Sequence, residues 1–290
     1  MFQPEFIFLK FLESIRTPFL NNFFEFITIL GEETVYIFLI CIIYFMFDKK
    51  LAQKLFFIAS ASIGLNCVIK NIVKLPRPFS NGEITCIRPE TATGYSFPSG
   101  HTQIAATCTS AIAIVFKKNW TVVFAIIATT LVGFSRMYLG AHFPLDVISA
   151  SILGVLIAFI LNNLHDKIEN KDILYLKVAI ISTIFAIIFM INPNVLFLDF
   201  YKFYGLFWGF ICAVKFEEKF VNFNYDCSKI KKIFRVIIGA LLAYILKVSI
   251  KLILVTDSVI ISYIFNTLRY FVLVIVVFAI LPLIFKIAKM

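Results

Sequence analysis

Two histidines lie in short polar stretches of an otherwise apolar chain, and their neighbours have the chemistry to handle a phosphate. His142 is followed four residues later by Asp146, a spacing that lets a carboxylate reach an imidazole around the start of a helix. An acid that holds one ring nitrogen fixes the tautomer and makes the other nitrogen a better base or nucleophile. A structural His–Asp pair that ties two apolar segments together explains the spacing equally well.

The second histidine, His101, ends the stretch Pro98-Ser99-Gly100-His101, immediately before an apolar run. Proline suits the first turn of a helix, serine is a good N-cap, and glycine lets a ligand approach the backbone closely. Backbone N–H groups at such a helix start bind anions. Helix-start chemistry alone explains Pro98 and Ser99. It explains His101 less well, because an apolar residue is less costly to place beside lipid.

Three strong cations, Lys70, Arg77 and Arg136, lie near these stretches. Lys70 and Arg77 are two helical turns apart, so they share a face if their helix continues that far. Pro76 and Pro78 argue that the helix ends near there. Arginine supplies a planar fork of donors and lysine a compact charge, and both suit a phosphate beside a membrane. Anchoring to anionic lipid headgroups is the alternative explanation for this pair.

Together these groups suffice for phosphoryl transfer without a metal. Cations hold the nonbridging oxygens, one histidine attacks phosphorus, and the other protonates the leaving oxygen. The third histidine, His165, is predicted to lie in a solvated loop and is given no role. The six cysteines form no CxxC pair and no His–Cys cluster, so we predict neither a zinc site nor a disulfide framework.

The elements that position these residues are predicted to be membrane helices. Hydrophobic residues make up 61% of the 290 positions, and apolar runs of about 18 residues, each long enough to cross a bilayer, recur. We predict an all-α polytopic bundle of about nine spans, preceded by an amphipathic segment, residues 2–30, that lies in the membrane interface. The predicted spans are 33–47, 53–73, 101–116, 119–137, 145–163, 174–192, 197–214, 236–255 and 264–285.

The net charge of +10 does not indicate nucleic-acid binding. Most of the 27 lysines and arginines lie in short loops on one side of the predicted spans, and this excess marks that side as cytoplasmic. The three polar stretches then share the extracytoplasmic side. Lys70, Lys74, Arg77, Arg88 and Arg136 are basic exceptions on that side, which indicates a site for negative charge.

Read in order, Lys70-x6-Arg77-Pro78, Pro98-Ser99-Gly100-His101 and Ser135-Arg136-x5-His142-x3-Asp146 resemble the three signature motifs of the type 2 phosphatidic acid phosphatase superfamily. The resemblance implies a membrane lipid phosphatase in which His142 forms a phosphohistidine, Asp146 orients it, and His101 is the general acid. It also implies that no metal or other cofactor is needed. The residues that it implies bind the phosphate are Lys70, Arg77, Ser99, Gly100 and Arg136.

We therefore expect a phosphatase core over residues 1–165, with all three motifs, and additional transmembrane helices of unassigned role over 166–290. The expected substrate is a lipid phosphate monoester or lipid pyrophosphate that enters from the bilayer and is hydrolysed at the extracytoplasmic face of the cell membrane. Candidates are undecaprenyl pyrophosphate, phosphatidylglycerophosphate and phosphatidic acid.

Two alternatives to hydrolysis remain open. The same phosphohistidine can pass its phosphate to another lipid or sugar instead of water. A lipid-phosphate binding or transport protein can retain the pocket without catalysis, although binding alone needs only the cations and not the two histidines with the acid. The soluble vanadate haloperoxidases share the motifs, but about nine apolar spans argue against that branch.

Overall fold

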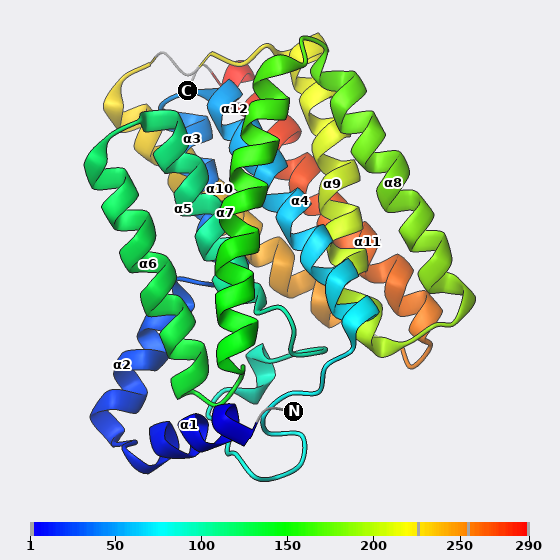
Figure 1. The fold of residues 1–290 in the computed structure, drawn as a ribbon. Coiled ribbons are helices and arrows are strands. Elements are labelled where there is room, and N and C mark those ends of the chain that lie inside the picture. The colour runs from blue at the N-terminus through cyan, green and yellow to red at the C-terminus, as the bar shows by residue number, and fades with distance from the viewer. Residues whose placement is uncertain (1–2, 225–226, 254–255, 289–290) are drawn as a thin grey trace. The chain divides into compact units, whose positions relative to one another are not determined.

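A computed structural model describes residues 3–224, 227–253 and 256–288, and every regular element in those ranges is helical (Figure 1). The all-α prediction is confirmed. The helices are α1 (Gln3–Ser14), α2 (Pro18–Ile29), α3 (Glu33–Met46), α4 (Lys49–Val73), α5 (Gly100–Phe116), α6 (Asn119–Tyr138), α7 (Pro144–Lys167), α8 (Lys171–Ile191), α9 (Leu198–Phe216), α10 (Lys229–Ile253), α11 (Val259–Ile275) and α12 (Leu281–Ile287). Four short helical segments complete the list: the 3-10 helices η1 (Pro89–Thr91) and η2 (Val195–Phe197), and the π-helical segments η3 (Glu217–Val221) and η4 (Val276–Ile280).

The predicted spans match the helices from α3 to α12 in order, with ends that differ by up to about seven residues, as for span 236–255, where α10 already begins at Lys229 and the last two residues of the span lie outside the described ranges. By length and apolar composition, seven stretches of the described chain are able to cross a membrane. The pair α2–α3, bent by 48°, adds an eighth if it counts as one span. The prediction of about nine included α5, which has only 17 residues and is buried along most of its length. The chain is a multi-pass membrane protein.

The chain divides into two compact units. Unit 1 comprises Met1–Tyr36 and Leu65–Leu164, and unit 2 comprises Ile37–Gly64 and His165–Met290. All the predicted site residues belong to unit 1. The assignment of residues 1–165 as a phosphatase core remains a prediction, since a compact unit is not by itself a functional one.

Within unit 1, α1 packs against the loop between α4 and α5 and against the start of α7. An apolar cluster joins α1 to these segments, and its buried members are Leu9, Leu12, Ile84 and Phe143. Phe6 adds an edge-to-face contact with Phe143, the rings lying 5.1 Å apart. The apolar face of α1 is therefore used in tertiary packing, which the prediction of an interfacial segment did not include.

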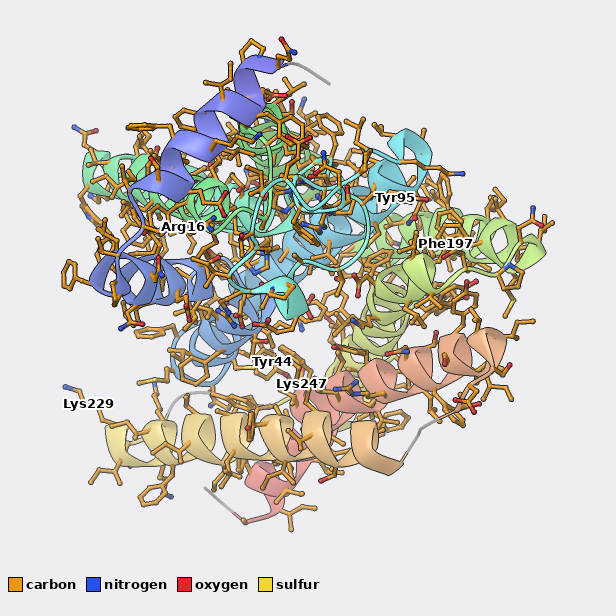
Figure 2. The ribbon with its side chains drawn as sticks, turned by 90° about the horizontal axis from the view of Figure 1, so that it is seen from below. Arg16, Tyr44, Tyr95, Phe197, Lys229 and Lys247 are labelled. Carbon is orange, nitrogen blue, oxygen red and sulfur yellow. The ribbon has the colours of Figure 1, made fainter. Side chains whose placement is uncertain are left out.

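Polar contacts reinforce this packing. Arg16, labelled in Figure 2, donates to the carbonyl oxygens of Thr85 and Tyr138, each at 2.9 Å. Glu5 Oε1 accepts a hydrogen bond from the backbone N–H of Leu145 at 2.8 Å. Leu145 lies in the first turn of α7, where an acidic partner satisfies an otherwise unpaired N–H group. Helix α1 thus stabilises the helix start that carries the His–Asp pair.

In unit 2, α9 and α11 lie close together because two glycines of α9 face the α11 backbone. A Cβ added at Gly205 would lie 2.1 Å from the Thr267 carbonyl oxygen, and one at Gly209 would lie 2.8 Å from that of Phe271. Small residues allow such close approach of membrane helices. The two glycines therefore set the spacing of this pair.

His165 corrects a prediction. It lies on α7, not in a loop, and only 8% of its surface is exposed. Its Nε2 lies 3.1 Å from the Tyr175 hydroxyl oxygen. The polar sequence around it, Asn-Asn-Leu-His-Asp-Lys, continues the helix for a further turn. His165 is therefore a buried, packed residue of unit 2.

Candidate active site

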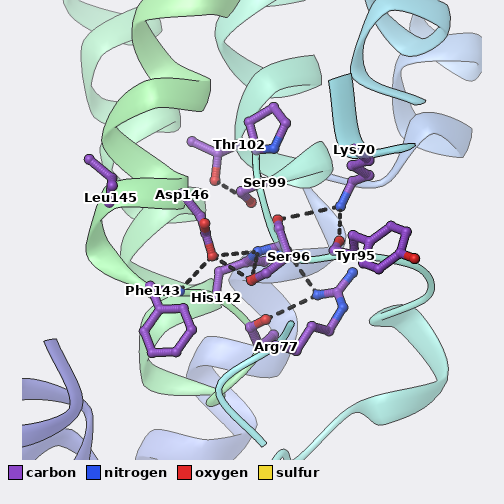
Figure 3. A network of polar contacts seen from close by, with 12 residues as sticks. Lys70, Arg77, Tyr95, Ser96, Ser99, Thr102, His142, Phe143, Leu145 and Asp146 are labelled. Atoms are coloured by element: carbon purple, nitrogen blue, oxygen red, sulfur yellow. Dashed lines mark hydrogen bonds and ion pairs between the residues drawn. The ribbon is translucent and has the colours of Figure 1, made fainter. Parts of the chain in front are cut away.

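Five of the predicted site residues meet near the end of α4 and the starts of α5 and α7 (Figure 3), namely Lys70, Arg77, Ser99, His142 and Asp146. Lys70 lies in the last turn of α4, and its Nζ donates to the Tyr95 carbonyl oxygen at 2.5 Å and the Ser96 carbonyl oxygen at 3.4 Å. The helix ends three residues later, as the prolines predict, and Lys74 adopts a left-handed conformation with φ of 54°. Lys70 and Arg77 therefore do not share a helix face.

Arg77 is buried and reaches the site from the loop that follows α4. Its Nε donates to the Gly94 carbonyl oxygen at 2.9 Å and its Nη2 to that of Thr93 at 2.5 Å. Its Nη1 donates to the Ala141 carbonyl oxygen at 3.0 Å and lies 3.1 Å from His142 Nε2. The guanidinium is thus fixed on the backbone while one nitrogen faces the predicted nucleophile.

The geometry of His142 determines its tautomer. Its Nδ1 lies 3.4 Å from Asp146 Oδ2, so the i and i+4 spacing does bring the pair together. Arginine can only donate, so Nε2 accepts from Arg77 and the ring proton is on Nδ1, toward the carboxylate. His142 is 1% exposed. Burial and the nearby cations, first Arg77, hold the pKa of His142 well below its usual range, so the ring is neutral at neutral pH.

Asp146 Oδ2 accepts further hydrogen bonds that fix the carboxylate. The backbone N–H of Phe143 donates at 2.9 Å, because Asp146 in the first turn of α7 reaches back to cap the helix that Pro144 begins. The Ser96 hydroxyl donates at 2.5 Å. Ser96 was not predicted to take part, since a lone serine three residues before Ser99 carries no distinguishing signal.

Ser99 stands at the N-cap position of α5, but its side chain does not cap the helix. Its hydroxyl oxygen accepts from Thr102 Oγ1 at 2.9 Å, so the expected capping bond is absent. A Cβ added at the adjacent Gly100 would have Asn66 Oδ1 as its nearest neighbour, at 3.4 Å. With no capping side chain, the first-turn N–H groups of α5 remain suited to an anion.

Arg136 and His101 carry buried nitrogen atoms that have no hydrogen-bond partner in the described protein. Arg136 is 0% exposed, and its Nη1 donates to Thr28 Oγ1 at 3.0 Å and Thr91 Oγ1 at 3.2 Å. Its Nε and Nη2 have no partner, nor has His101 Nε2. An unpaired buried polar group costs about 1–3 kcal/mol, and more when it is charged. An anion bound between these nitrogens would accept the hydrogen bonds that they lack.

The bend between α2 and α3 also contributes to this site, although no residue near it was predicted to do so. Thr28 is buried and holds Arg136. A Cβ added at Gly31 would lie 2.9 Å from His101 Cβ and 2.6 Å from Val132 Cγ1, so only glycine fits against the start of α5 here. Neither residue lies in a motif, and both fall at the edge of a segment interpreted as interfacial, so no sequence signal identified them.

Ser135 of the third motif, and Tyr138 at one of its unspecified positions, make hydrogen bonds away from the site. The Ser135 hydroxyl donates to the Val132 carbonyl oxygen at 2.6 Å, within α6. The Tyr138 hydroxyl donates to Asn21 Oδ1 on α2 at 3.0 Å. Among the described residues, no group of three or more His, Cys, Asp or Glu is placed to hold a metal ion. The site in this part of the chain is thus one of cations, histidines and one acid.

Comparisons with known proteins agree with the motifs. Residues 51–169 match the PAP2 superfamily, and residues 201–290 match the transmembrane extension of PAP2 superfamily phosphatases. All the predicted site residues lie in the first match. The second match covers much of the segment whose role the sequence left unassigned.

Individual relatives support the same assignment. The chain is 33% identical to undecaprenyl-diphosphatase of Sulfolobus acidocaldarius, over 49% of this chain and 68% of that protein. It is 32% identical to phosphatidylglycerophosphatase B of Bacillus subtilis, over 54% and 80%. The crystal structure of a transmembrane PAP2 type phosphatidylglycerolphosphate phosphatase from Bacillus subtilis superposes with a TM-score of 0.50 at 27% identity, covering 58% of this chain and 87% of that one. The chain belongs to the PAP2 superfamily and is a membrane lipid phosphatase.

Proposed function

We propose that this protein hydrolyses a lipid phosphate monoester or lipid diphosphate at the extracytoplasmic face, through a phosphohistidine on His142. The observation that carries the proposal is the set of unpartnered buried nitrogens on Arg136 and His101. Both residues lie near enough to His142 to act on its charge. A phosphoryl group supplies the acceptor oxygens that these nitrogens lack, and a neutral His142 supplies the nucleophile.

In the first step, the Nε2 lone pair of His142 forms a bond to phosphorus as the bond from phosphorus to the lipid oxygen breaks. Arg77 donates to that lone pair at 3.1 Å in the structure, and a phosphate oxygen offers Arg77 a better acceptor. Binding of the phosphate anion favours the protonated form of His101, which then gives its proton to the leaving oxygen. Asp146 balances the charge of the imidazolium, whose Nδ1 proton stays in place.

In the second step, water replaces the lipid. His101, now neutral, takes a proton from water as the water oxygen bonds to phosphorus and the bond from phosphorus to Nε2 breaks. Inorganic phosphate leaves, and both histidines return to their starting states. Lys70, Arg77, Arg136, the Ser99 hydroxyl and the Gly100 N–H bind the nonbridging oxygens throughout.

The substrate class is inferred from the relatives and from the place of the site. Undecaprenyl-diphosphatase and phosphatidylglycerophosphatase B are named for lipids with a diphosphate and a phosphate monoester, respectively. The proposed site lies at the ends of membrane helices, so a lipid is able to present its phosphate while its tails stay in the bilayer. We therefore propose both headgroup classes as candidates.

A phosphate-release screen tests this proposal. Purified protein in mixed micelles is given undecaprenyl diphosphate, phosphatidylglycerophosphate or phosphatidic acid, with and without an acceptor alcohol. We expect release from at least one lipid, and His142→Ala reduces it by at least ~10⁴-fold. The matched control is His165→Ala, which removes another buried histidine, one paired with Tyr175, and retains activity.

Each result has a definite consequence. Equal rates for the parent and His142→Ala contradict the nucleophile assignment. No release from any of the three lipids contradicts the substrate class. A phosphorylated acceptor formed in place of inorganic phosphate identifies a phosphotransferase. Protein quenched with detergent at alkaline pH, where a phosphohistidine survives, should carry phosphate from a labelled substrate in the parent and not in His142→Ala.

The proposed face has its own test. An impermeant thiol reagent applied to intact cells should label Cys86 and spare Cys227, in a background where the exposed Cys212 is replaced by serine. Burial raises the pKa of the Cys86 thiol, so labelling is run near pH ~8.5, where more of the thiol is reactive thiolate. Labelling of Cys227 alone would reverse the orientation.

A further inference from the structure

The Ser96 side chain closes a triangle with the proposed nucleophile and its acid (Figure 3). Its Oγ lies 2.5 Å from Asp146 Oδ2 and 3.3 Å from His142 Nδ1. An ionised carboxylate can only accept, so the hydroxyl donates its proton to Asp146. The Nδ1–H group of His142 then lies between two acceptors, the carboxylate oxygen and the serine oxygen.

The backbone holds Ser96 in place from both sides. Its N–H donates to the Leu75 carbonyl oxygen at 2.8 Å. Its carbonyl oxygen, and that of Tyr95 before it, accept from Lys70 Nζ. Ser96 is 0% exposed, so water does not compete for its hydroxyl. The hydroxyl is therefore oriented before any substrate arrives.

We propose that Ser96 is a positioning residue for the reaction, acting through Asp146 on His142; this inference rests on the proposed role of His142. Asp146 Oδ2 receives three donors, from Ser96, Phe143 and His142, and the serine contact is the shortest of the three. It fixes the direction of the carboxylate, which in turn keeps the His142 proton on Nδ1 and the lone pair on Nε2.

A purely structural role for Ser96, as a partner for a buried carboxylate, makes a different prediction. In our proposal the serine tunes how strongly Asp146 stabilises the imidazolium. Without that donor, Oδ2 carries more negative charge and stabilises the imidazolium more, which raises the pKa of His142. Five titratable or charged groups influence the pKa of His142. Asp146 on α7 and Arg77 in the loop after α4 contact the ring. Lys70 on α4, Arg136 on α6 and His101 on α5 act on it through their charge. Ser96→Ala leaves all of them unchanged.

The test compares Ser96→Ala with Ser151→Ala. Ser151 lies on α7 like Asp146, but its hydroxyl donates only to the Val147 carbonyl oxygen of its own helix, at 2.9 Å. We expect Ser96→Ala to lower kcat by ~10- to 100-fold with KM within about twofold, because Asp146 no longer holds the His142 ring in the orientation for attack, and this loss outweighs the stronger stabilisation of the imidazolium. We expect the acid limb of kcat/KM to move to higher pH by about half a unit to one unit. Ser151→Ala should change neither.

A conservative variant separates the hydroxyl from the packing. Ser96→Thr keeps the donor and should recover part of the lost kcat and the parental acid limb. The melting temperature of each variant is measured alongside. If Ser96→Thr does not fold, the pH of the acid limb of kcat/KM in Ser96→Ala, compared with that of the parent, distinguishes a positioning role from a structural one.

Failure of this inference is distinct from failure of the proposed function. If the parent releases phosphate, His142→Ala does not, and Ser96→Ala matches Ser151→Ala, only the role of Ser96 is contradicted. A uniform loss of rate in Ser96→Ala with an unmoved acid limb shows a structural role and overturns the inference. A parent that hydrolyses no lipid phosphate contradicts the proposed function and this inference with it.

Discussion

Each unit contains a charged cluster around a fully buried side chain, Glu217 in unit 2 and Arg136 in unit 1. The two clusters differ in whether every polar atom of that side chain has a hydrogen-bond partner. In unit 2, Glu217 is 0% exposed and accepts from Lys49 Nζ at 3.0 and 3.3 Å and from the Phe223 N–H at 2.6 Å. Lys49 also donates to Asn222 Oδ1 at 3.3 Å. In unit 1, Arg136 is equally buried but leaves Nε and Nη2 without a partner among the residues that the structure describes.

The difference teaches that burial of charge does not by itself mark an active site. The Lys49–Glu217 pair is internally satisfied, which is what a structural ion pair in an apolar protein requires. The Arg136 cluster keeps donors that no described protein group satisfies, and a bound anion would satisfy them. Unmet hydrogen bonds at converging groups distinguish the two clusters, and four changes test that distinction.

The largest effect is expected from Glu217→Ala. Removing the acid leaves the partly buried Lys49 without its charge partner, which costs about 3 kcal/mol of stability, the lower end of the range for a broken buried pair. The melting temperature in detergent should fall clearly, while the folded fraction keeps phosphate release within about twofold of the parent. A melting temperature equal to the parent's would show that the Lys49–Glu217 pair does not stabilise the fold.

Arg136→Lys reverses the pattern, with a loss of activity and little loss of stability. Lysine keeps the charge but offers no planar fork, so the two unpartnered donors, Nε and Nη2, are lost. We expect kcat/KM to fall by ~10²–10³-fold, the loss typical for a donor that stabilises transition-state charge. Melting in detergent should stay close to that of the parent, and a strong destabilisation would place Arg136 with the structural cluster.

Thr28→Val removes a hydrogen-bond acceptor of Arg136 and leaves the arginine itself in place. Valine has nearly the shape of threonine but cannot accept from Arg136 Nη1, so the guanidinium loses one of its two threonine contacts. A lost hydrogen bond to a charged group is worth about 1.5–3 kcal/mol. Since Thr91 remains, we expect the lower end, ~10-fold in kcat/KM for lipid phosphate, whereas an unchanged value would remove α2 from the site.

The smallest effect is a shift in pH dependence. Because burial and Arg77 lower the pKa of His142, the neutral ring persists as pH falls, and the acid limb of kcat/KM should lie below the usual histidine value of about 6.5. Activity is lost only as pH falls through that lowered pKa. Arg77→Gln removes one positive charge and should move the limb to higher pH. A limb at or above 6.5 in the parent would contradict the cationic environment.

Sequence reasoning was most successful where spacing along one helix fixes geometry. The four-residue step from His142 to Asp146 predicts a contact around one helix turn, and the structure has it. The prolines after Lys70 predict the end of α4 correctly. Membrane helices follow from apolar length, which depends on composition and not on tertiary contacts.

The missed residues all act through tertiary contacts. Thr28 and Ser96 reach Arg136 and Asp146 from segments 108 and 50 residues away, and neither has a residue type that indicates a site. Gly31 matters because of what packs against it, which no single sequence displays. His165 was misassigned because polar neighbours indicated a loop, although the helix continues and buries the ring against Tyr175.

The bend between α2 and α3 bears on what the smallest working enzyme is. The superfamily match begins at residue 51, but Thr28 and Gly31 contact Arg136 and His101, and Glu5 caps the start of α7. A protein trimmed to the matched segment would keep every signature residue and lose these three supports at once. The segment that matches the superfamily is thus shorter than the segment that supports the site. A design that moves the motifs into another protein should therefore include α1 and α2.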